Sequence, residues 1–174
     1  MTDRTAKVAL FWDESFLWGL IAYDTFREIG VEFDLLTSKD IREGALEGYR
    51  LLCGPGGWAS DKIVALGDEG RERIRDFVDA GGSYFGICGG AGLALSHETG
   101  LALVHVSRMS TKARLPSFSG GIALEPVDAE HSMWRGFPDG AVFHAWWPGQ
   151  FALEDADDVE VLAIYAKPAP GSFV

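Results

Sequence analysis

One cysteine of this chain stands among glycines, in a setting that suits nucleophilic chemistry. Cys88 follows a short apolar run and precedes a helix-like stretch of small residues, in the order Tyr84-Phe85-Gly86-Ile87-Cys88-Gly89-Gly90-Ala91-Gly92. This is the layout of a nucleophile elbow, with sulfur in place of the hydroxyl of the Gly-x-Ser-x-Gly form. A residue at such a sharp strand-to-helix turn is strained, and only small neighbours let the backbones approach each other.

The helix expected after Cys88 would direct its first N–H groups and the positive end of its dipole at the sulfur, which favours thiolate over thiol. The alternative is a buried, inert cysteine in a glycine-rich turn. Because flanking glycines are a costly way to bury a small apolar group, we favour a reactive cysteine. The sequence therefore predicts that Cys88 directly follows a strand and has a positive φ, and that Gly89 or Gly90 begins a helix.

Alternating strand and helix patterns must position this cysteine. Apolar runs predict strands at residues 7–12, 31–36, 49–53 and 83–87. Amphipathic or small-residue patterns predict helices from Ser15 to Gly30, over 67–80 and from Cys88 to Leu95. Beyond residue 100 the pattern changes to strands joined by turns, at residues 101–106, 121–127, 141–146 and 159–165.

These β–α–β units predict an α/β fold, a flavodoxin-like three-layer α/β/α arrangement with a mostly parallel central sheet. Loops that follow parallel strands emerge at the same sheet edge, where such folds bind ligands. We therefore expect Asp13 or Glu14, Gly57 and Cys88 to line one crevice. Cys53, which ends its strand, is expected to be buried and structural.

Composition limits the classes of function. The 174 residues are 47% hydrophobic, so we expect one well-buried domain over residues 1–174. The net charge of −11 argues against a nucleic-acid partner, because no basic stripe could neutralise phosphates. Two cysteines cannot form a disulfide framework, and neither a signal peptide nor a membrane-spanning apolar run occurs. The sequence thus predicts a cytoplasmic protein with no membrane partner.

Two glycine motifs resemble those of a known superfamily. Pro55-Gly56-Gly57 and Gly86-Ile87-Cys88-Gly89-Gly90, separated by one amphipathic helix, resemble class I glutamine amidotransferase-like domains. Within that superfamily the chain is most similar to the domain at the N-terminus of eukaryotic biotin–protein ligases, which also occurs as free-standing bacterial proteins. Residues 74–91 carry most of the likeness, and 131–137 and 148–151 fit more loosely. The adenylate-binding loop of the biotin ligase catalytic domain is absent, so biotin transfer is not predicted.

The resemblance implies roles for three residues. Cys88 would be the nucleophile that attacks an amide or thioester carbonyl, and the backbone N–H groups of Gly57 and Gly89 would form the oxyanion hole. Glycine suits this role because its unobstructed N–H can approach the developing oxyanion. The alternative for Pro55-Gly56-Gly57 is an ordinary tight turn, and the sequence leaves both interpretations open.

The general base is where the chain departs from the family. Class I amidotransferases carry a His-Pro-Glu-like element after their last strands, and this sequence has none. His97 would lie ~13 Å from Cys88 along one helix, too far for direct proton transfer, and nothing recommends His105 or His131. His144 is the best internal candidate for the base, although a lone histidine among aromatic residues is more often a packed core residue.

Two other sources of the missing general base and acid stay open. The chain stops at Ser172-Phe173-Val174, inside what looks like a strand, so we expect a C-terminal truncation with the base and acid beyond Val174. In the intracellular-protease and chaperone branch of the superfamily, a carboxylic acid after the first strand hydrogen-bonds the elbow cysteine, and Glu14 lies near that place. The favoured alternative for Glu14 is a carboxylate at a helix start, beside Ser15 as N-cap.

Two classes of function remain. One is a cysteine-dependent enzyme that hydrolyses a small amide or transfers nitrogen from it; the other is a catalytically silent domain that binds a small metabolite or a partner in the same crevice. Four tryptophans near predicted strand ends could wall an apolar pocket or be ordinary core residues: Trp12, Trp58, Trp146 and Trp147. No metal or cofactor is predicted, since neither metal-ligand spacings nor a phosphate loop occur. The expected partner is a small molecule, and a homo-oligomer is left open.

Overall fold

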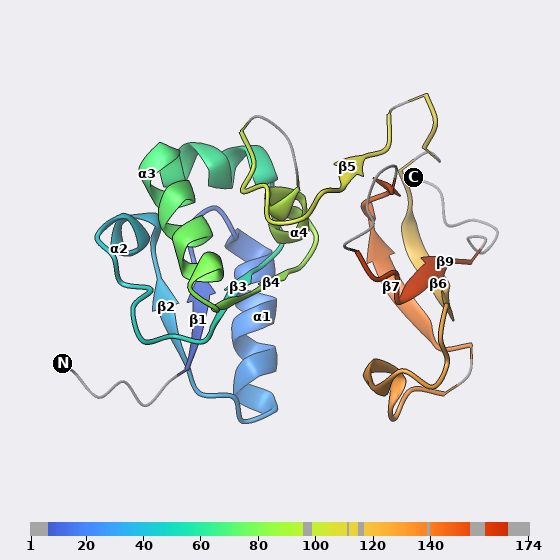
Figure 1. Ribbon diagram of the computed structural model, residues 1–174. Helices are drawn as coiled ribbons and strands as arrows, with labels where there is room; N and C mark the ends of the chain where they lie inside the picture. The colour runs from blue at the N-terminus through green and yellow to red at the C-terminus, as the bar shows by residue number, and fades with distance from the viewer. Residues whose placement is uncertain are drawn as a thin grey trace. The chain divides into compact units, whose positions relative to one another are not determined.

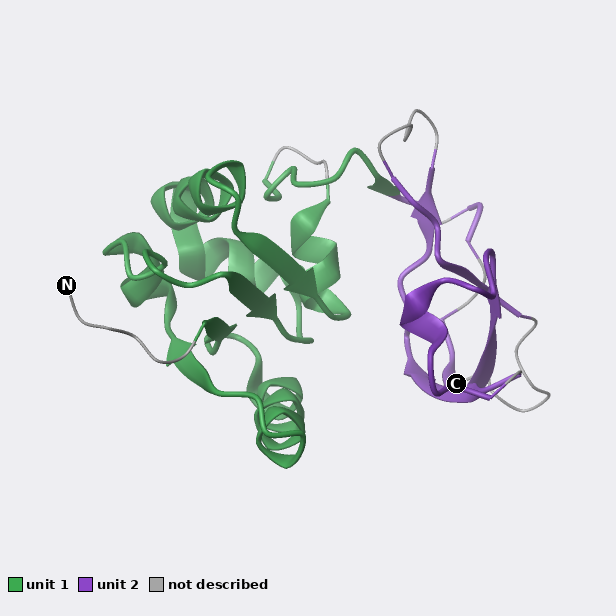
Figure 2. Cartoon of the chain, turned by 60° about the horizontal axis from the view of Figure 1, so that its bottom comes forward, with its two compact units in different colours: residues 1–107 green, residues 108–174 purple. Residues whose placement is uncertain are grey.

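The computed structural model describes residues 7–95, 99–110, 112–114, 117–138, 140–153 and 159–166. The chain divides into two compact units, residues 1–107 and 108–174 (Figure 2). The expectation of one domain over residues 1–174 stays a prediction. Among the residues described, no helix is long and apolar enough to cross a membrane.

Unit 1 contains the parallel sheet that the alternating pattern predicts. Its strands are β1 (Val8–Phe11), β2 (Phe33–Leu36), β3 (Leu51–Gly54) and β4 (Ser83–Gly86). They pair in the order β2-β1-β3-β4, and every pairing is parallel. The four predicted strands are therefore confirmed, and the fold is α/β.

Helices cover both faces of this sheet because successive strand side chains point to opposite sides. On one face, Leu10 and Cys53 pack with Ala22 of α1 (Phe16–Glu28). On the other face lie α2 (Ser38–Arg42), α3 (Ala59–Asp79) and α4 (Gly89–Ala94). The larger cluster on that face joins Ala9, Phe11 and Leu52 to Ile41, Leu66, Ile74 and Leu93. Figure 1 shows the resulting layers, with α1 and α3 on either side of the strands.

Two helical segments differ from the prediction. Helix α3 begins at Ala59 rather than Gly67, and Gly67 is a bend inside it, with φ 61° and ψ −172°. The short helix α2 was not predicted. It is specified by a capping box, in which the Thr37 hydroxyl accepts from the Asp40 N–H while the Asp40 carboxylate accepts from the Thr37 N–H.

Unit 2 is built from antiparallel strands. Strand β6 (Ser119–Pro126) pairs with β7 (Val142–Trp146) and with β9 (Ala163–Tyr165). The two-residue strand β5 (Ser107–Arg108), at the boundary of the two units, pairs with β8 (Phe151–Ala152), and a 3₁₀ turn spans Ser132–Trp134. The C-terminal half is thus richer in turns and strands, as predicted.

The predicted strand over residues 101–106 is wrong. This apolar run is a loop in unit 1, with one isolated bridge between Val104 and Leu95. Its N–H groups donate to the end of α4 instead of to a neighbouring strand: the Leu101 N–H to the Leu93 carbonyl and the Leu103 N–H to the Ala94 carbonyl. The run is apolar because it packs on the core, so periodicity alone could not separate it from a strand.

Candidate functional site

Cys88 has the backbone geometry that its glycine neighbours predict. It stands between β4 and α4, as the N-cap residue of α4, with φ 54° and ψ −111°. This conformation is sparsely populated for a residue with a side chain, and such positions cost about 1–3 kcal/mol each. The thiol is exposed. The predicted strained turn, with Gly89 as the first helical residue, is confirmed.

The glycines after Cys88 allow backbone to pack directly on backbone. A Cβ on Gly89 would lie 1.8 Å from the Gly57 carbonyl oxygen, and one on Gly90 would lie 1.8 Å from the Gly54 carbonyl oxygen. The Tyr84 hydroxyl donates to the Gly90 carbonyl at 2.9 Å, and burial raises the pKa of this hydroxyl well above its usual range. Helix α4 is therefore held tightly against the loop that follows β3.

The loops after β1, β3 and β4 meet at one edge of the sheet, as predicted. Gly57 has φ 111°, and a Cβ there would lie 2.5 Å from the Glu14 carbonyl oxygen. The Gly57 nitrogen is 3.3 Å from the position that a Gly89 Cβ would take. Within the described residues, neither the Gly57 N–H nor the Gly89 N–H donates a hydrogen bond. Both N–H groups are therefore close to each other and to the turn that carries Cys88.

The carboxylates after β1 take different positions. The Asp13 carboxylate accepts from the Ser38 N–H at 2.6 Å, so it caps the start of α2. Glu14 has φ 53°, with an exposed side chain and its carbonyl against Gly57. Ser15 is the N-cap residue of α1 but makes no side-chain capping bond, because its hydroxyl points to the Phe11 carbonyl. The structure thus brings the Glu14 main chain into the site.

Lys62 is a site residue that sequence reasoning missed. It is fully buried in α3, and its ammonium donates to the Asp13 carbonyl at 3.3 Å, the Glu14 carbonyl at 3.0 Å and the Ser15 hydroxyl at 2.6 Å. It also lies 5.3 Å from the centre of the Phe11 ring.

Burial lowers the pKa of Lys62 from its usual 10.5 to about 8, although the negative charges of Glu14, Asp13, Cys88 and Asp61 oppose that shift. The sequence does carry a signal for this lysine. The buried positions of α3 are spaced by four residues, and Lys62 occupies the first of them, followed by Leu66, Gly70 and Ile74.

Cys53 is buried, whereas Cys88 is exposed. Cys53 has no exposed surface, packs with Leu10 and Ala22 between the sheet and α1, and burial raises the pKa of its thiol to about 11. The prediction that Cys53 is a buried structural residue is confirmed.

The described histidines lie on separate segments of the chain. His144 lies on β7 of unit 2, paired with Gly121 of β6, and its role as a base stays a prediction. His131 accepts from the Met133 N–H at the start of the 3₁₀ turn, and His105 lies in the loop before β5. His97 lies outside the described residues.

The tryptophans have separate environments. Trp12 packs edge-on against Tyr23 in the smaller core cluster. Trp58 is the N-cap residue of α3, directly after the Gly57 turn, and is 63% exposed. Trp146 and Trp147 lie in unit 2 at the end of β7, and both are exposed. In the chain, Trp58 directly follows the Gly57 turn, and Trp12 directly precedes the Asp13–Ser15 loop.

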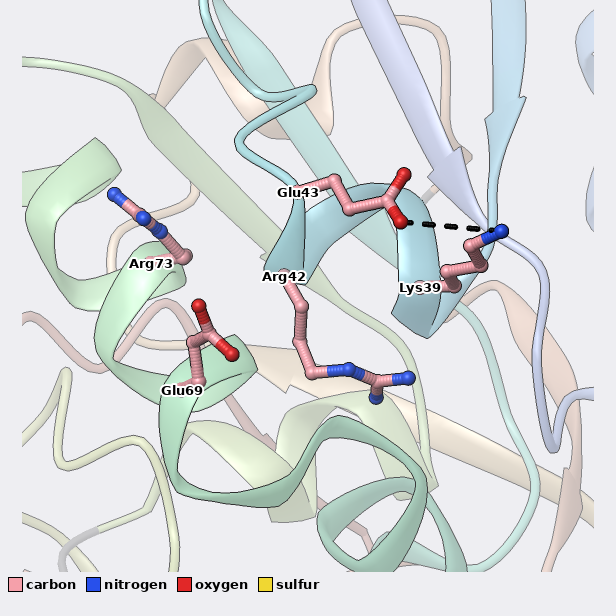
Figure 3. Close-up of a pocket in the computed structure, with 5 residues that line it drawn as sticks. All are labelled: Lys39, Arg42, Glu43, Glu69 and Arg73. Atoms are coloured by element: carbon pink, nitrogen blue, oxygen red, sulfur yellow. Dashed lines mark ion pairs between the residues drawn. The ribbon is translucent and has the colours of Figure 1, made fainter.

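Unit 1 has two cavities whose lining residues do not include Gly57, Cys88 or Gly89. One, of about 600 Å³, is lined by charged side chains of α2 and α3, where Lys39 pairs with Glu43 at 3.8 Å (Figure 3). The other, of about 730 Å³, follows residues 43–50 and 80–82, the segments that lead into β3 and β4. The second cavity therefore lies at the opposite edge of the sheet from the one at which β3 and β4 end. In the described ranges, no three His, Cys, Asp or Glu side chains group as a metal site would require.

Comparison with known proteins supports the assignment of the fold. Residues 41–102, which include Gly57, Lys62 and Cys88, match the family model described as biotin-protein ligase, N terminal. Among curated proteins, none matches the sequence significantly.

Several solved structures share the fold. A glutamine amidotransferase from Thermotoga maritima is 23% identical, with a TM-score of 0.55, over 86% of this chain and 63% of that protein. PurLQS from Thermotoga maritima is 19% identical, with a TM-score of 0.64, over 96% of this chain and 77% of that one. A cytoplasmic protein from Salmonella typhimurium is 19% identical, with a TM-score of 0.62, over 91% of this chain and 78% of that protein.

These identities establish fold and not activity, and the chain spans less than two thirds of the Thermotoga amidotransferase. The resemblance read from the Pro-Gly-Gly and Gly-Ile-Cys-Gly-Gly motifs is confirmed. The chain has the class I glutamine amidotransferase-like fold, and its residues 41–102 are similar to the biotin–protein ligase N-terminal family.

Proposed function

We propose that this protein is a cysteine-dependent enzyme of the class I glutamine amidotransferase type, acting on a small amide or related carbonyl with Cys88 as nucleophile. The observation that carries the proposal is the strained, exposed Cys88 at the β4–α4 turn, with φ 54°, packed beside the Gly57 turn. Strain is retained at a position only when the surrounding structure enforces it, and it clusters at functional sites.

The chemistry requires two kinds of group besides the thiolate. The sulfur attacks the carbonyl carbon, the carbonyl oxygen becomes an oxyanion, and the amine leaves after it takes a proton. The N–H groups of Gly57 and Gly89 are the proposed oxyanion donors, since they lie close together and make no other hydrogen bond within the described residues. Loss of one such donor costs about 3 kcal/mol of transition-state stabilisation in other enzymes.

The second required group is a proton shuttle. His144 is the candidate within this sequence, and the proposed role of Glu14 is limited to its carbonyl, which supports the Gly57 turn. We therefore expect negligible ammonia release from glutamine by the 174-residue chain. Ammonia release that is lost in both Cys88→Ala and His144→Ala would assign the base to His144.

The nucleophile is tested by trapping, which does not need the base. A chloroketone analogue of glutamine should form a covalent adduct at Cys88, detected by intact mass and peptide mapping. Glutamine or another small amide should slow this reaction, and Cys88→Ala should abolish it. Cys53→Ala is the matched control, because it removes the other thiol and should leave the adduct unchanged. Labelling that no amide slows would contradict a substrate site at Cys88.

A second candidate function is supported by Trp58. An exposed indole directly after the Gly57 turn is a surface on which a small metabolite could stack. In that case the protein binds a small metabolite in the same crevice without turning it over. This metabolite should quench Trp58 fluorescence equally in the wild-type protein and in Cys88→Ala. Under either candidate we propose a small-molecule partner rather than nucleic acid or a membrane, and a cytoplasmic location.

A further inference from the structure

We propose that Lys62 is a positioning residue of the Cys88 site, whose buried ammonium holds the Asp13–Ser15 loop in place and supplies positive charge to the loops on which the Cys88 turn rests. This inference rests on the proposed function in that Cys88 is taken as the reacting group. It concerns a residue of α3 that contacts no substrate itself, because its side chain is completely buried.

The hydrogen bonds of Lys62 fit its charged form. An ammonium group has three protons, and three acceptors surround it: two carbonyls of the β1–α1 loop, from Asp13 and Glu14, and the Ser15 hydroxyl. The Ser15 hydroxyl can still donate onward to the Phe11 carbonyl. A neutral amine has only two protons, so one of these acceptors would lose its donor.

The same atoms connect Lys62 to the proposed oxyanion donors. The Glu14 carbonyl that accepts from Lys62 is the atom against which Gly57 packs, and the Lys62 nitrogen lies 3.6 Å from the position of a Gly57 Cβ. The Gly57 carbonyl in turn lies against Gly89, the residue after Cys88. One buried side chain thus braces the loops after β1 and β3, on which the turn after β4 rests.

Charge gives Lys62 a second effect that bracing alone would not produce. The charged or titratable groups that act on it are Asp13 and Glu14 from the β1–α1 loop, Asp61 from its own helix, and Cys88 from the turn after β4. Since electrostatic interaction is mutual, a protonated Lys62 stabilises negative charge at Cys88 and attracts an anionic reagent to it. The lowered pKa of Lys62 means that this attraction is lost as the pH rises through about 8.

The test compares two alkylating reagents at Cys88. Iodoacetate is an anion and iodoacetamide is neutral, and both react with the same thiolate. The ratio of their rate constants therefore cancels the thiolate fraction and reports the local charge. In the wild-type protein at low ionic strength, we expect the ratio to fall about threefold as the pH rises through the Lys62 transition. In Lys62→Met the ratio should be low and independent of pH.

Two further variants separate the charge of Lys62 from its bracing hydrogen bonds and from the loss of any positive charge on the protein. Lys62→Gln keeps hydrogen-bond donors but no charge, so it should also show a low, flat ratio. Lys39→Met removes one positive charge from an exposed side chain of α2 and should keep the wild-type transition. A flat ratio in the wild-type protein, or an unchanged transition in Lys62→Met, would overturn the proposal.

The outcome is independent of the amidase test. Cys88 is exposed, so it alkylates whether or not it is catalytic, and the wild-type pH profile needs no variant to fold. A protein whose Cys88 trapping is not slowed by amides can therefore still show the pH-dependent fall in the iodoacetate-to-iodoacetamide ratio. A protein whose trapping is slowed by amides can equally lack that fall.

Discussion

Burying an ammonium group is unfavourable unless hydrogen bonds and opposite charge offset the loss of water. At Lys62 the offset is partial, because its acceptors are two carbonyls and a hydroxyl rather than a contacting carboxylate. A methionine of similar length would pack against the Phe11 ring without that desolvation. A costly buried charge under the loops that support a strained cysteine is therefore the feature at residue scale that most needs a functional reason.

The first prediction concerns the stability contributed by Lys62. Its folded-state pKa, about 8, is below its usual 10.5, so the unfolded chain binds more protons than the folded chain between these pH values. The free energy of unfolding should therefore rise with pH across this window, by up to about 3 kcal/mol relative to Lys62→Met. Urea denaturation of both proteins at several pH values measures the difference. A difference that stays constant would contradict the assigned pKa.

The second prediction compares the two thiols. Exposed Cys88 should react with iodoacetamide near neutral pH, whereas buried Cys53, with a pKa of about 11, should not react on the same timescale. Peptide mapping after timed quenching distinguishes them, and Cys88→Ala should leave the folded protein nearly unlabelled. In urea both thiols should react, which shows that structure protects Cys53. Equal labelling of both in the native state would refute the burial of Cys53.

At the scale of elements, the β4–α4 turn depends on missing side chains. In Gly89→Ala, the new Cβ would be placed 1.8 Å from the Gly57 carbonyl, so either α4 or the Gly57 turn must move. We expect a loss of about 3 kcal/mol in the free energy of unfolding. Gly70→Ala in α3 is the control, because its Cβ would meet the Leu66 side chain at 3.1 Å, a smaller overlap than 1.8 Å from a backbone oxygen, and alanine favours a helix. Thermal and urea unfolding should therefore rank Gly89→Ala well below Gly70→Ala.

The elements differ in how far sequence could predict them. The strands of unit 1 and the Cys88 turn were predictable because apolar runs bounded by glycines carry a local signal. Helix α2 has only five residues and depends on one Thr37–Asp40 capping box, which was overlooked. The start of α3 was missed because Lys62, a charged residue, occupies a core position, and the bend at Gly67 interrupts the helix. Whether His144 meets Cys88 depends on how the two units are placed, which local patterns do not encode.

At the scale of the whole molecule, the core and the candidate nucleophile belong to the same part of the chain. Both clusters of buried apolar residues draw all their members from unit 1, from Ala9 to Leu101. Cys88, Lys62 and both proposed oxyanion donors lie there too, whereas His144 lies in unit 2. The division of the chain is therefore also a division between the proposed nucleophile and the candidate base.

This division predicts the behaviour of a fragment that ends at the boundary of unit 1. Residues 1–107 should unfold cooperatively in urea, because the fragment retains the parallel sheet and both apolar clusters. Cys88 should still be alkylated while Cys53 stays protected, and the iodoacetate-to-iodoacetamide ratio should keep its dependence on Lys62. If His144 is the base, any ammonia release by the full chain must disappear in the fragment while trapping at Cys88 persists. A fragment that retains ammonia release would exclude His144 and require the base to come from unit 1.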